Sequence, residues 1–262
     1  MLFGKCGRRL FAFLAAVCLA GLPLCALLAG CGEARPASGA AEDAPTEDGA
    51  QDGARQPMIA LTFDDGPSEH TERLLDLFAA YGGHGTFCVI GNRIDLLPKT
   101  VARAVREGNE LAVHSWDHCQ LTRLGADKVT EEIESTRQKI LELTGKDCTV
   151  LRPTYGAVND TLMRVAKELD MIVVNWSVDT LDWKTRNADT TLRAVLNGAQ
   201  DGAIILCHDL YGETVDAMER AIPALVARGY RLVTVTELLT ADARTVEAGR
   251  LYRKQGPKPQ TE

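Results

Sequence analysis

The chain has 262 residues, with 29 basic and 36 acidic side chains and a formal net charge of −7. This balance excludes the basic surface that nucleic acids and other polyanions require, so we expect no nucleic-acid partner and favour a neutral or positively charged one. The length suits a single α/β barrel, which often has about 250 residues.

Residues 1–30 predict a bacterial lipoprotein signal peptide. Three basic side chains precede an uncharged stretch over residues 10–30, which ends in small residues directly before Cys31. This order is typical of a secretory signal, and its ending resembles a lipobox, in which the Cys31 thiol is acylated after cleavage. An uncleaved membrane helix is the alternative, although Pro23 weakens it. With either anchor, we expect the remaining chain outside the cytoplasm, tethered to the membrane.

Residues 31–57 predict a flexible acidic linker, because they are rich in Ala, Gly, Pro, Glu and Asp and hold almost no large apolar side chain. Removing residues 1–30 would take away three positive charges and change the formal charge from −7 to −10. We expect the catalytic domain over residues 58–240 and a polar C-terminal tail over residues 241–262, frayed from Arg250 onward.

Apolar, β-branched runs alternate with segments of helical periodicity from residue 58 onward. We expect strands at residues 58–63, 86–90, 110–114, 149–152, 172–177, 203–207 and 231–235. We expect helices at residues 71–80, 99–107, 129–143, 161–169, 190–197 and 215–227. Such alternation implies a parallel sheet with right-handed crossovers.

An open doubly wound sheet and a closed barrel both satisfy this alternation. Polar clusters follow five of the seven expected strands, whereas an open sheet concentrates its site at one switch point. We therefore predict an α/β fold, a distorted (β/α) barrel with about seven parallel strands.

Four cysteines lie in or beside the expected strands, where a buried thiol behaves as a small hydrophobe. They lack the C-x-x-C spacing of a zinc knot, so none is assigned to metal. Three disulfide pairings and free thiols all stay open. The four are Cys88, Cys119, Cys148 and Cys207.

Asp64 and Asp65 close the first expected strand and precede a Gly-Pro turn that would expose both carboxylates. They could equally be loop residues that hydrogen-bond the turn backbone. His114 and His118 are four residues apart, so a helical turn beginning at His114 would put both rings on one face. Alone, such a pair is more often one capping and one core-edge histidine. Beside an acid pair, two histidines and one carboxylate form an open metal site.

Arg152 ends the fourth strand, where it could lock one aspartate of the acid pair or serve as an ordinary surface arginine. His208 follows a fully apolar strand and is either a satisfied core residue or a proton carrier. Asp179 and Asp182 are both candidates for the acid of their loop, and Trp183 is more often a packing residue than a catalytic one.

In order along the chain, these clusters read TFDDGPS (residues 62–68), HSWDH (114–118), RPTYG (152–156), DTLDW (179–183) and LCHD (206–209). Together they resemble the five motifs of the carbohydrate esterase family 4 polysaccharide deacetylases, and the resemblance covers about residues 58–239. It implies a distorted (β/α) barrel and metal-dependent removal of acetyl groups from sugar polymers.

The resemblance also implies a metal site and a general base. Asp65, His114 and His118 would hold a divalent metal, usually zinc, with cobalt, manganese or nickel as alternatives. Asp64 would be the general base that activates the attacking water, and Arg152 would orient Asp64.

The same resemblance assigns the remaining catalytic roles. His208 would protonate the departing amine, and Asp182 would hold His208 in its cationic form. The backbone N–H of Tyr155 would help to stabilise the oxyanion, while Trp183 and Leu206 would line the acetyl pocket. Many relatives carry a second proline where this chain has Thr154, a departure expected to affect loop rigidity slightly and leave catalysis intact.

We therefore expect a deacetylase that acts on N-acetylglucosamine residues of peptidoglycan. Tyr155 and the sequence around Trp183 look more like the glucosamine-directed members than the muramic-acid-directed ones. A chitooligosaccharide deacetylase and an acetylxylan esterase are alternatives, and a non-catalytic glycan-binding surface lipoprotein is a rival of another class. No obligate protein partner is evident from the sequence.

Overall fold

The computed structural model describes residues 55–256. The predicted signal peptide, the predicted lipidation residue Cys31 and most of the predicted linker lie outside the described residues. Arg55, at the end of that linker, pairs with Asp201 and Asp242, each at 3.0 Å, so the described chain is fixed to the fold from its first residue.

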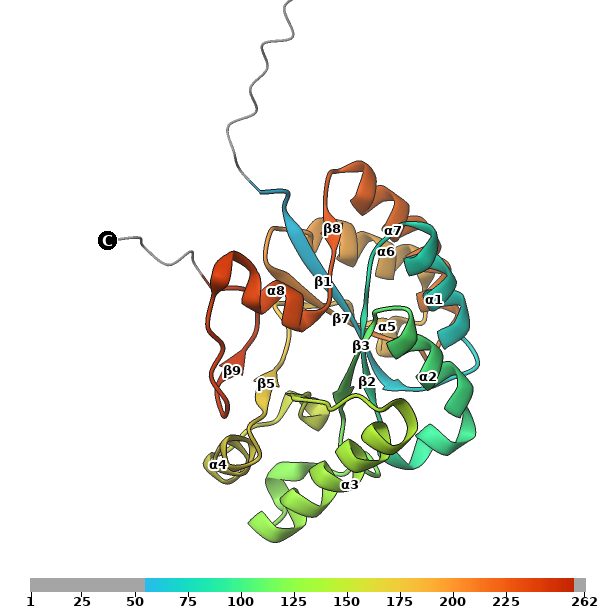
Figure 1. The fold of residues 1–262 in the computed structure, drawn as a ribbon. Helices are drawn as coiled ribbons and strands as arrows, with labels where there is room; N and C mark the ends of the chain where they lie inside the picture. Colours follow the sequence, from blue (N-terminus) through green and yellow to red (C-terminus); the bar gives the residue numbers. More distant parts are fainter. Residues whose placement is uncertain (1–54, 257–262) are drawn as a thin grey trace, which may run out of the picture. The chain divides into compact units, whose positions relative to one another are not determined.

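The described chain alternates strands with helices (Figure 1). The strands are β1 (Met58–Gly66), β2 (Thr86–Val89), β3 (Glu110–Val113), β4 (Val150–Leu151), β5 (Ile172–Val174), β6 (Val178–Asp179), β7 (Ala203–His208), β8 (Arg231–Leu232) and β9 (Leu251–Tyr252). The α-helices are α1 (Thr71–Ala80), α2 (Pro98–Arg106), α3 (Ala126–Thr144), α4 (Asp160–Glu168), α5 (Asp182–Thr185), α6 (Ala188–Gly198), α7 (Gly212–Ala227) and α8 (Val235–Thr240). Short 3₁₀ turns are η1 (Gly91–Leu96), η2 (Leu121–Arg123), η3 (Thr154–Gly156) and η4 (Ala241–Ala243).

The strands form one sheet in the order β6-β7-β1-β2-β3-β4-β5-β9, with β8 also paired to β1. Every pairing between these strands is parallel. Beyond β9, the backbone N–H of Gln255 donates to the carbonyl of Gly202 at 2.8 Å, directly before β7, and so draws the two sides of the curled sheet together. The predicted distorted (β/α) barrel is confirmed.

All seven expected strands and all six expected helices are present, but the structure adds β6, β9, α5 and α8. The expectation of fraying from Arg250 onward is wrong for residues 250–256. Leu251 and Tyr252 extend the sheet beside β5, and the buried side chain of Gln255 donates to the carbonyl of Leu238 at 2.7 Å. Of the described helices, none is both long and apolar enough to cross a membrane.

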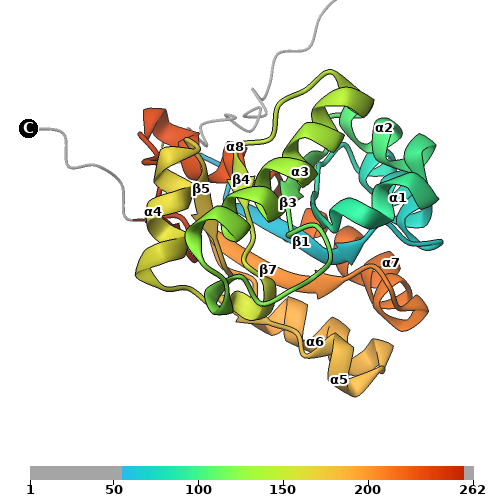
Figure 2. The same cartoon turned by 90° about the horizontal axis from the view of Figure 1, so that it is seen from below.

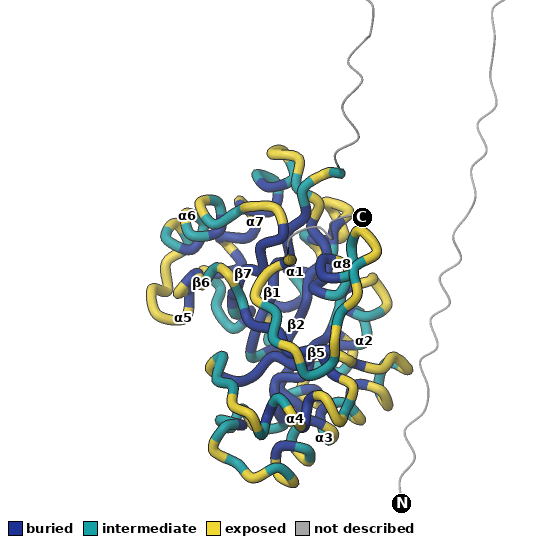
Figure 3. The backbone as a smooth tube through the Cα atoms, turned by 90° about the vertical axis from the view of Figure 1, so that its left-hand side faces the viewer, coloured by how far each residue is buried: buried dark blue, intermediate teal, exposed yellow. Residues whose placement is uncertain are grey.

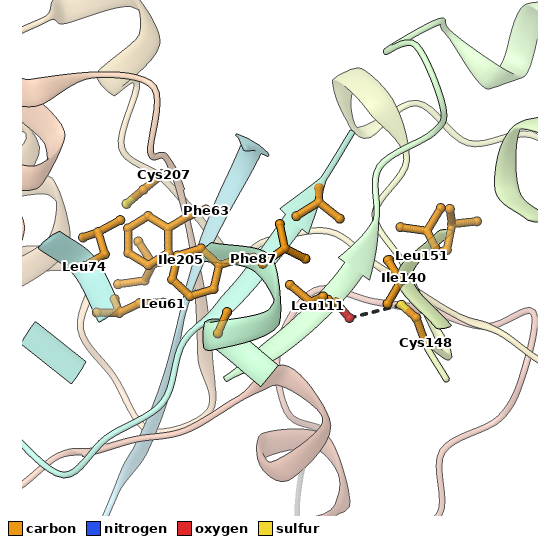
Figure 4. Packing of buried hydrophobic residues seen from close by; sticks show 14 of the residues in the cluster. Leu61, Phe63, Leu74, Phe87, Leu111, Ile140, Cys148, Leu151, Ile205 and Cys207 are labelled. Atoms are coloured by element: carbon orange, nitrogen blue, oxygen red, sulfur yellow. Dashed lines mark hydrogen bonds between the residues drawn. The ribbon is translucent and has the colours of Figure 1, made fainter. Parts of the chain in front are cut away.

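Buried apolar side chains form a cluster on each face of the sheet, as expected of parallel strands. Strands such as β1 and β7 are accordingly buried along most of their length (Figure 3). On one face, helices such as α1, α2 and α7 cover the sheet, while α8 lies on the other side of β1 (Figure 1). Phe63 from β1 stacks on Phe87 from β2 with ring centroids 5.3 Å apart, and Leu74 of α1 belongs to the same cluster (Figure 4).

Strand β1 alternates between these two faces and thereby positions the site. Ile59, Leu61 and Phe63 belong to the helix-covered cluster, whereas Met58 and Ala60 belong to the inner one. Because side chains alternate along a strand, the next inner positions are Thr62 and Asp64. The inner face therefore changes from apolar to polar at the carboxyl end of the strand, and Figure 2 shows β1 and β7 side by side there.

The four cysteines of the described residues are free thiols. Three of them are buried, and Cys148 donates through Sγ to the carbonyl of Leu111 at 3.1 Å (Figure 4). Burial raises the pKa of the Cys148 thiol to about 12, so it stays protonated. The question that the sequence left open is therefore answered for these residues in favour of free, packed thiols.

Candidate active site and metal centre

Asp64 and Asp65 both face one cleft because a bulge interrupts β1. The pairing of β1 with β2 shifts register between Asp64 and Gly66, and Asp65 lies at φ 72°, in the left-handed region. Strict alternation would turn neighbouring side chains to opposite faces, and a bulge re-aims one of them. Asp64 is buried on the inner face, and Asp65 reaches the histidines of the second cluster.

Asp65, His114 and His118 form the only cluster in the described chain that combines two histidines with a carboxylate. The Nε2 atoms of His114 and His118 lie 3.3 and 3.0 Å from Asp65 Oδ1. The expected helical turn from His114 is wrong: residues 114–118 form an irregular bend in which His118 has φ 65°. This bend is held from α3, where Glu132 Oε2 accepts the backbone N–H of Trp116 at 2.8 Å.

The chemistry of these donors fits a divalent cation. His114 Nδ1 lies 2.7 Å from the carbonyl of Arg152, which can only accept, so Nδ1 carries the proton and Nε2 offers its lone pair. Burial raises the pKa of Asp65, but its contacts with His114 and His118 outweigh burial and hold that pKa well below its usual range. Asp65 Oδ1 is buried without a hydrogen-bond donor among the described residues. A carboxylate and imidazole nitrogens that converge in this way match the ligands of a metal.

Asp64 forms a buried ion pair with Arg152. Arg152 Nη1 donates to Asp64 Oδ1 at 2.7 Å, and the side chains are 1% and 5% exposed. The same guanidinium donates through Nη2 to Thr62 Oγ1 at 3.0 Å and through Nε to the carbonyl of Val174 at 2.7 Å. Arg152 is therefore a fixed internal residue, not the surface arginine that the sequence left possible.

His208 faces Asp64 from the neighbouring strand and is held from behind by Asp182. Asp64 and His208 are register partners between β1 and β7, so their side chains share the inner face. His208 Nδ1 lies 2.9 Å from Asp182 Oδ1, and Thr214 donates to Asp182 Oδ2 at 2.8 Å. Burial lowers the pKa of His208, but the contact with Asp182 outweighs it and raises that pKa above its ordinary value. The exposed Asp179 instead accepts the backbone N–H of Leu181 at 2.8 Å.

A cleft of about 380 Å³ joins these groups. Its walls include the predicted binding residues Tyr155, Trp183 and Leu206, and also Trp176 and Tyr211, which the sequence analysis did not single out. Tyr155 and Trp183 are 66% and 48% exposed, so their apolar surfaces are open to a ligand, whereas Leu206 is buried at the base. Exposed aromatic rings of this kind are suited to packing against sugar rings.

Thr154, the departure from the motif, makes a contact that proline could not. Its hydroxyl donates to the carbonyl of Cys119 at 2.5 Å, and so joins the Tyr155 turn to the bend that carries His118. Tyr155 itself lies at φ 59°, and its hydroxyl is 3.4 Å from His118 Nδ1. The substitution therefore replaces the stiffness of a proline ring with a tertiary hydrogen bond.

Asp209 is a buried support of the site to which the sequence analysis gave no role. Its carboxylate accepts the hydroxyl of Thr71, and its carbonyl accepts the hydroxyl of Ser68 at 2.6 Å. Burial raises the pKa of Asp209 to about 7. An added Cβ on Gly66 would lie only 2.7 Å from this carboxylate, so the turn after Asp65 packs directly on it. Its position beside His208 was the sole sequence signal.

Comparison with known proteins agrees with this geometry. The polysaccharide deacetylase family profile matches residues 51–174. Over 70% of its length the chain is 44% identical to peptidoglycan-N-acetylmuramic acid deacetylase PdaC of Bacillus subtilis, and over 69% it is 42% identical to peptidoglycan-N-acetylglucosamine deacetylase PgdA of Listeria monocytogenes. It spans 39% and 38% of the length of these two proteins.

Solved structures give the same grouping. The B. subtilis PdaC structure superposes with a TM-score of 0.67 at 43% identity, covering 70% of this chain and 90% of that one. A family 4 acetyl xylan esterase from Clostridium thermocellum, in complex with a cobalt ion, superposes with a TM-score of 0.70 at 33% identity, covering 75% and 98%. The fold, the motif residues and these similarities together show that the chain belongs to the polysaccharide deacetylase family.

Proposed function

We propose that the protein is a metal-dependent deacetylase that hydrolyses N-acetyl groups of N-acetylglucosamine residues in peptidoglycan or a related glycan. One observation carries the proposal. A carboxylate held by an arginine and a histidine held by a carboxylate face each other on adjacent strands, beside a cluster of two histidines and one carboxylate. Amide hydrolysis needs a base for water and an acid for the departing amine, and this cleft offers both.

Asp65, His114 and His118 would hold the divalent metal. When bound there, the cation would polarise the acetyl carbonyl and lower the pKa of a water molecule. We propose zinc, because histidine nitrogens and one carboxylate with open positions suit it, while cobalt, manganese and nickel suit the same donors. Cobalt is the ion in the solved acetyl xylan esterase of this family.

Asp64 would take the proton from the attacking water. Its Oδ1 is occupied by Arg152, which fixes the carboxylate and leaves Oδ2, 3.9 Å from His114 Nε2, toward the ligand cluster. Arg152 cannot give up its own proton, so it orients Asp64 without competing for the water proton.

His208 would deliver a proton to the departing amine, because an amine leaves far more readily than an amide anion. Asp182 would keep His208 protonated, and Thr214 would fix Asp182. The backbone N–H of Tyr155 would stabilise the oxyanion, and Trp183 with Leu206 would line the acetyl pocket.

Acetate release tests this proposal. The full chain, purified in detergent and stripped by chelation, is assayed on peptidoglycan, N-acetylglucosamine oligomers and acetylxylan, before and after zinc, cobalt or manganese is restored. We expect metal-restored release that is highest from peptidoglycan. Preference for chitin-like oligomers or for acetylxylan would redirect the substrate assignment, and silence from a folded, metal-loaded sample on every glycan would refute the activity.

The variant Asp64→Asn distinguishes the deacetylase from a non-catalytic glycan-binding protein. For the deacetylase we expect loss of turnover, with the circular dichroism spectrum and glycan binding retained. Asp179→Asn, on the same cleft but without a contact to the ligand cluster, is the matched control and should retain most of the activity.

We also propose that the domain lies outside the cytoplasm, anchored by a lipid on Cys31 after cleavage of residues 1–30. The sequence pattern before Cys31 supports this proposal. Cys31→Ser should prevent labelling with a radioactive fatty acid and either release the domain or stall its processing. If fatty-acid labelling and maturation are the same in Cys31→Ser as in the native chain, the lipid anchor on Cys31 is refuted. The uncleaved helix would then be favoured as the anchor.

A further inference from the structure

Two arginines, Arg186 and Arg93, are anchored to residues that line the cleft. Arg186 Cζ lies 3.2 Å from the centroid of the Tyr211 ring, and Arg186 Nε donates to the carbonyl of Trp183 at 3.0 Å. Arg93 Nη1 donates to the carbonyl of Asp65 at 2.8 Å. Both arginines therefore contact residues that line the cleft.

Neither Arg186 nor Arg93 has a carboxylate within 4.0 Å among the residues that the structure describes, although the chain holds more acids than bases. An unpaired arginine on a surface does not by itself indicate a binding site. Exposed ion pairs contribute little to stability, so the absence of one costs little. These two differ because neutral groups of the site hold them in place: an aromatic face and two backbone carbonyls.

The stacking on Tyr211 prepares Arg186 for an anion. A guanidinium whose face lies on a ring keeps its edge free, and that edge is the fork that binds a carboxylate through two parallel hydrogen bonds. Nε is used by Trp183, while Nη1 and Nη2 have no acceptor in the described chain. Since the stacked side chain is already ordered, it loses less conformational entropy when a ligand binds.

The residues that these two arginines contact, Asp65, Trp183 and Tyr211, line one and the same cleft. The ring centroids of Tyr211 and His208 are 6.1 Å apart. A carboxylate bound by the two arginines would thus lie beside the sugar that is deacetylated and not in the acetyl pocket itself.

We propose that Arg186 and Arg93 form a carboxylate-binding subsite that recognises an acidic group on the residue adjoining the reacting sugar. This inference rests on the proposed deacetylase function and makes it more specific, because chitin and acetylated xylan backbones lack that group. In peptidoglycan, the carboxylate can come from the lactyl ether of muramic acid or from the stem peptide.

The test is a ratio of kcat/KM values for acetate release by the metal-loaded full chain. Peptide-free and peptide-bearing peptidoglycan oligomers are compared with the same oligomers after amidation of their carboxylates. We expect the native chain to prefer the carboxylate form by about tenfold, as a charge-assisted hydrogen bond at a partly exposed site allows. Preference confined to the peptide-free oligomers assigns the lactyl carboxylate, and preference confined to the peptide-bearing ones assigns the stem peptide.

Arg186→Gln and Arg93→Gln should each lower this ratio, and the double variant should bring it close to one. Arg193→Gln is the matched control. Arg193 on α6 also lacks a carboxylate partner within 4.0 Å in the described chain, but it donates to Thr190, which does not line the cleft. The Arg186 and Arg93 variants could instead lower kcat/KM equally for the carboxylate and the amidated forms of the substrate. The arginines would then only position Tyr211 and Trp183, and the subsite would be refuted.

Calorimetric binding of the same oligomers separates this inference from the proposed activity. The native chain could bind the carboxylate form more tightly, and Arg186→Gln could remove that preference, while the native chain releases no acetate. This result would refute the deacetylase function and support the subsite. A native chain that binds both forms equally would refute the subsite whatever its activity.

Discussion

Replacing Arg152 with methionine should destabilise the protein by about 3–5 kcal/mol, because it leaves a buried carboxylate without its partner. The side chains of Arg152 and Asp64 are 1% and 5% exposed, so water cannot replace the lost contact. The change also removes donors from Thr62 and from the carbonyl of Val174. A loss of this size is a large share of the 5–15 kcal/mol that typically stabilises a folded domain.

Urea unfolding of the full chain, followed by circular dichroism at pH 7 in the presence of a chelator, measures this loss without interference from metal. The matched control is Arg164→Met, which breaks a pair with Glu168 whose side chains are 55% and 58% exposed. We expect this control to cost less than about 0.5 kcal/mol. Arg152→Lys keeps the charge but loses the fork, and should lie between the two.

A double-mutant cycle with Asp64→Asn tests the cause. If the penalty comes from a stranded carboxylate, Asp64→Asn should recover part of the stability in the Arg152→Met background, with a coupling of about 1–3 kcal/mol. Losses that add to within about 0.5 kcal/mol would show that Arg152 and Asp64 contribute independently, and the ion-pair reasoning would fail.

Three further changes test the site. His114→Ala should weaken zinc binding by more than about a hundredfold in competition with a chromogenic chelator, because it removes one of three ligands, whereas Asp117→Ala should change it less than about twofold. Asp182→Asn should move the basic limb of the pH profile of kcat/KM to lower pH. Asp182 raises the pKa of His208, so without it the protonated form of His208 would be lost at a lower pH. A basic limb that does not move would contradict the assignment of His208 as the acid. Gly66→Ala should cost about 1–3 kcal/mol in the urea assay, because its Cβ would meet the Asp209 carboxylate at 2.7 Å. Gly125→Ala, where no atom lies within 4 Å, should be nearly neutral.

The elements that the sequence predicted well are those with a long local pattern. Helix α1 has the predicted bounds, and β1 and β7 follow continuous apolar runs. The strands β6 and β9 have two residues each, too few for any alternation to be recognised. Strand β9 forms because the chain returns to β5 from far along the sequence, which no local pattern can indicate.

For the site, the sequence indicated which residues come together but not how the backbone presents them. Asp65 and His118 have left-handed φ values, which composition and spacing do not reveal, and the helical turn expected from the spacing of the two histidines was wrong for this reason. Glu132 and Asp209 support the site through contacts that exist only in the folded chain. The predicted roles of the site residues stay predictions until the variants are measured.

The register of β7 against β1 determines what the site can do. Asp64 and His208 are opposite each other, so the proposed base and acid share one face. A slip of β7 by one residue would bring Cys207 or Asp209 to that position, neither of which could replace a protonated histidine held by Asp182. The Asp64 carboxylate lies against the fixed cation of Arg152, and the His208 ring lies against the Asp182 carboxylate. The two pairs therefore set a carboxylate held by a cation opposite a histidine held by a carboxylate, as the proposed base and acid of one reaction require.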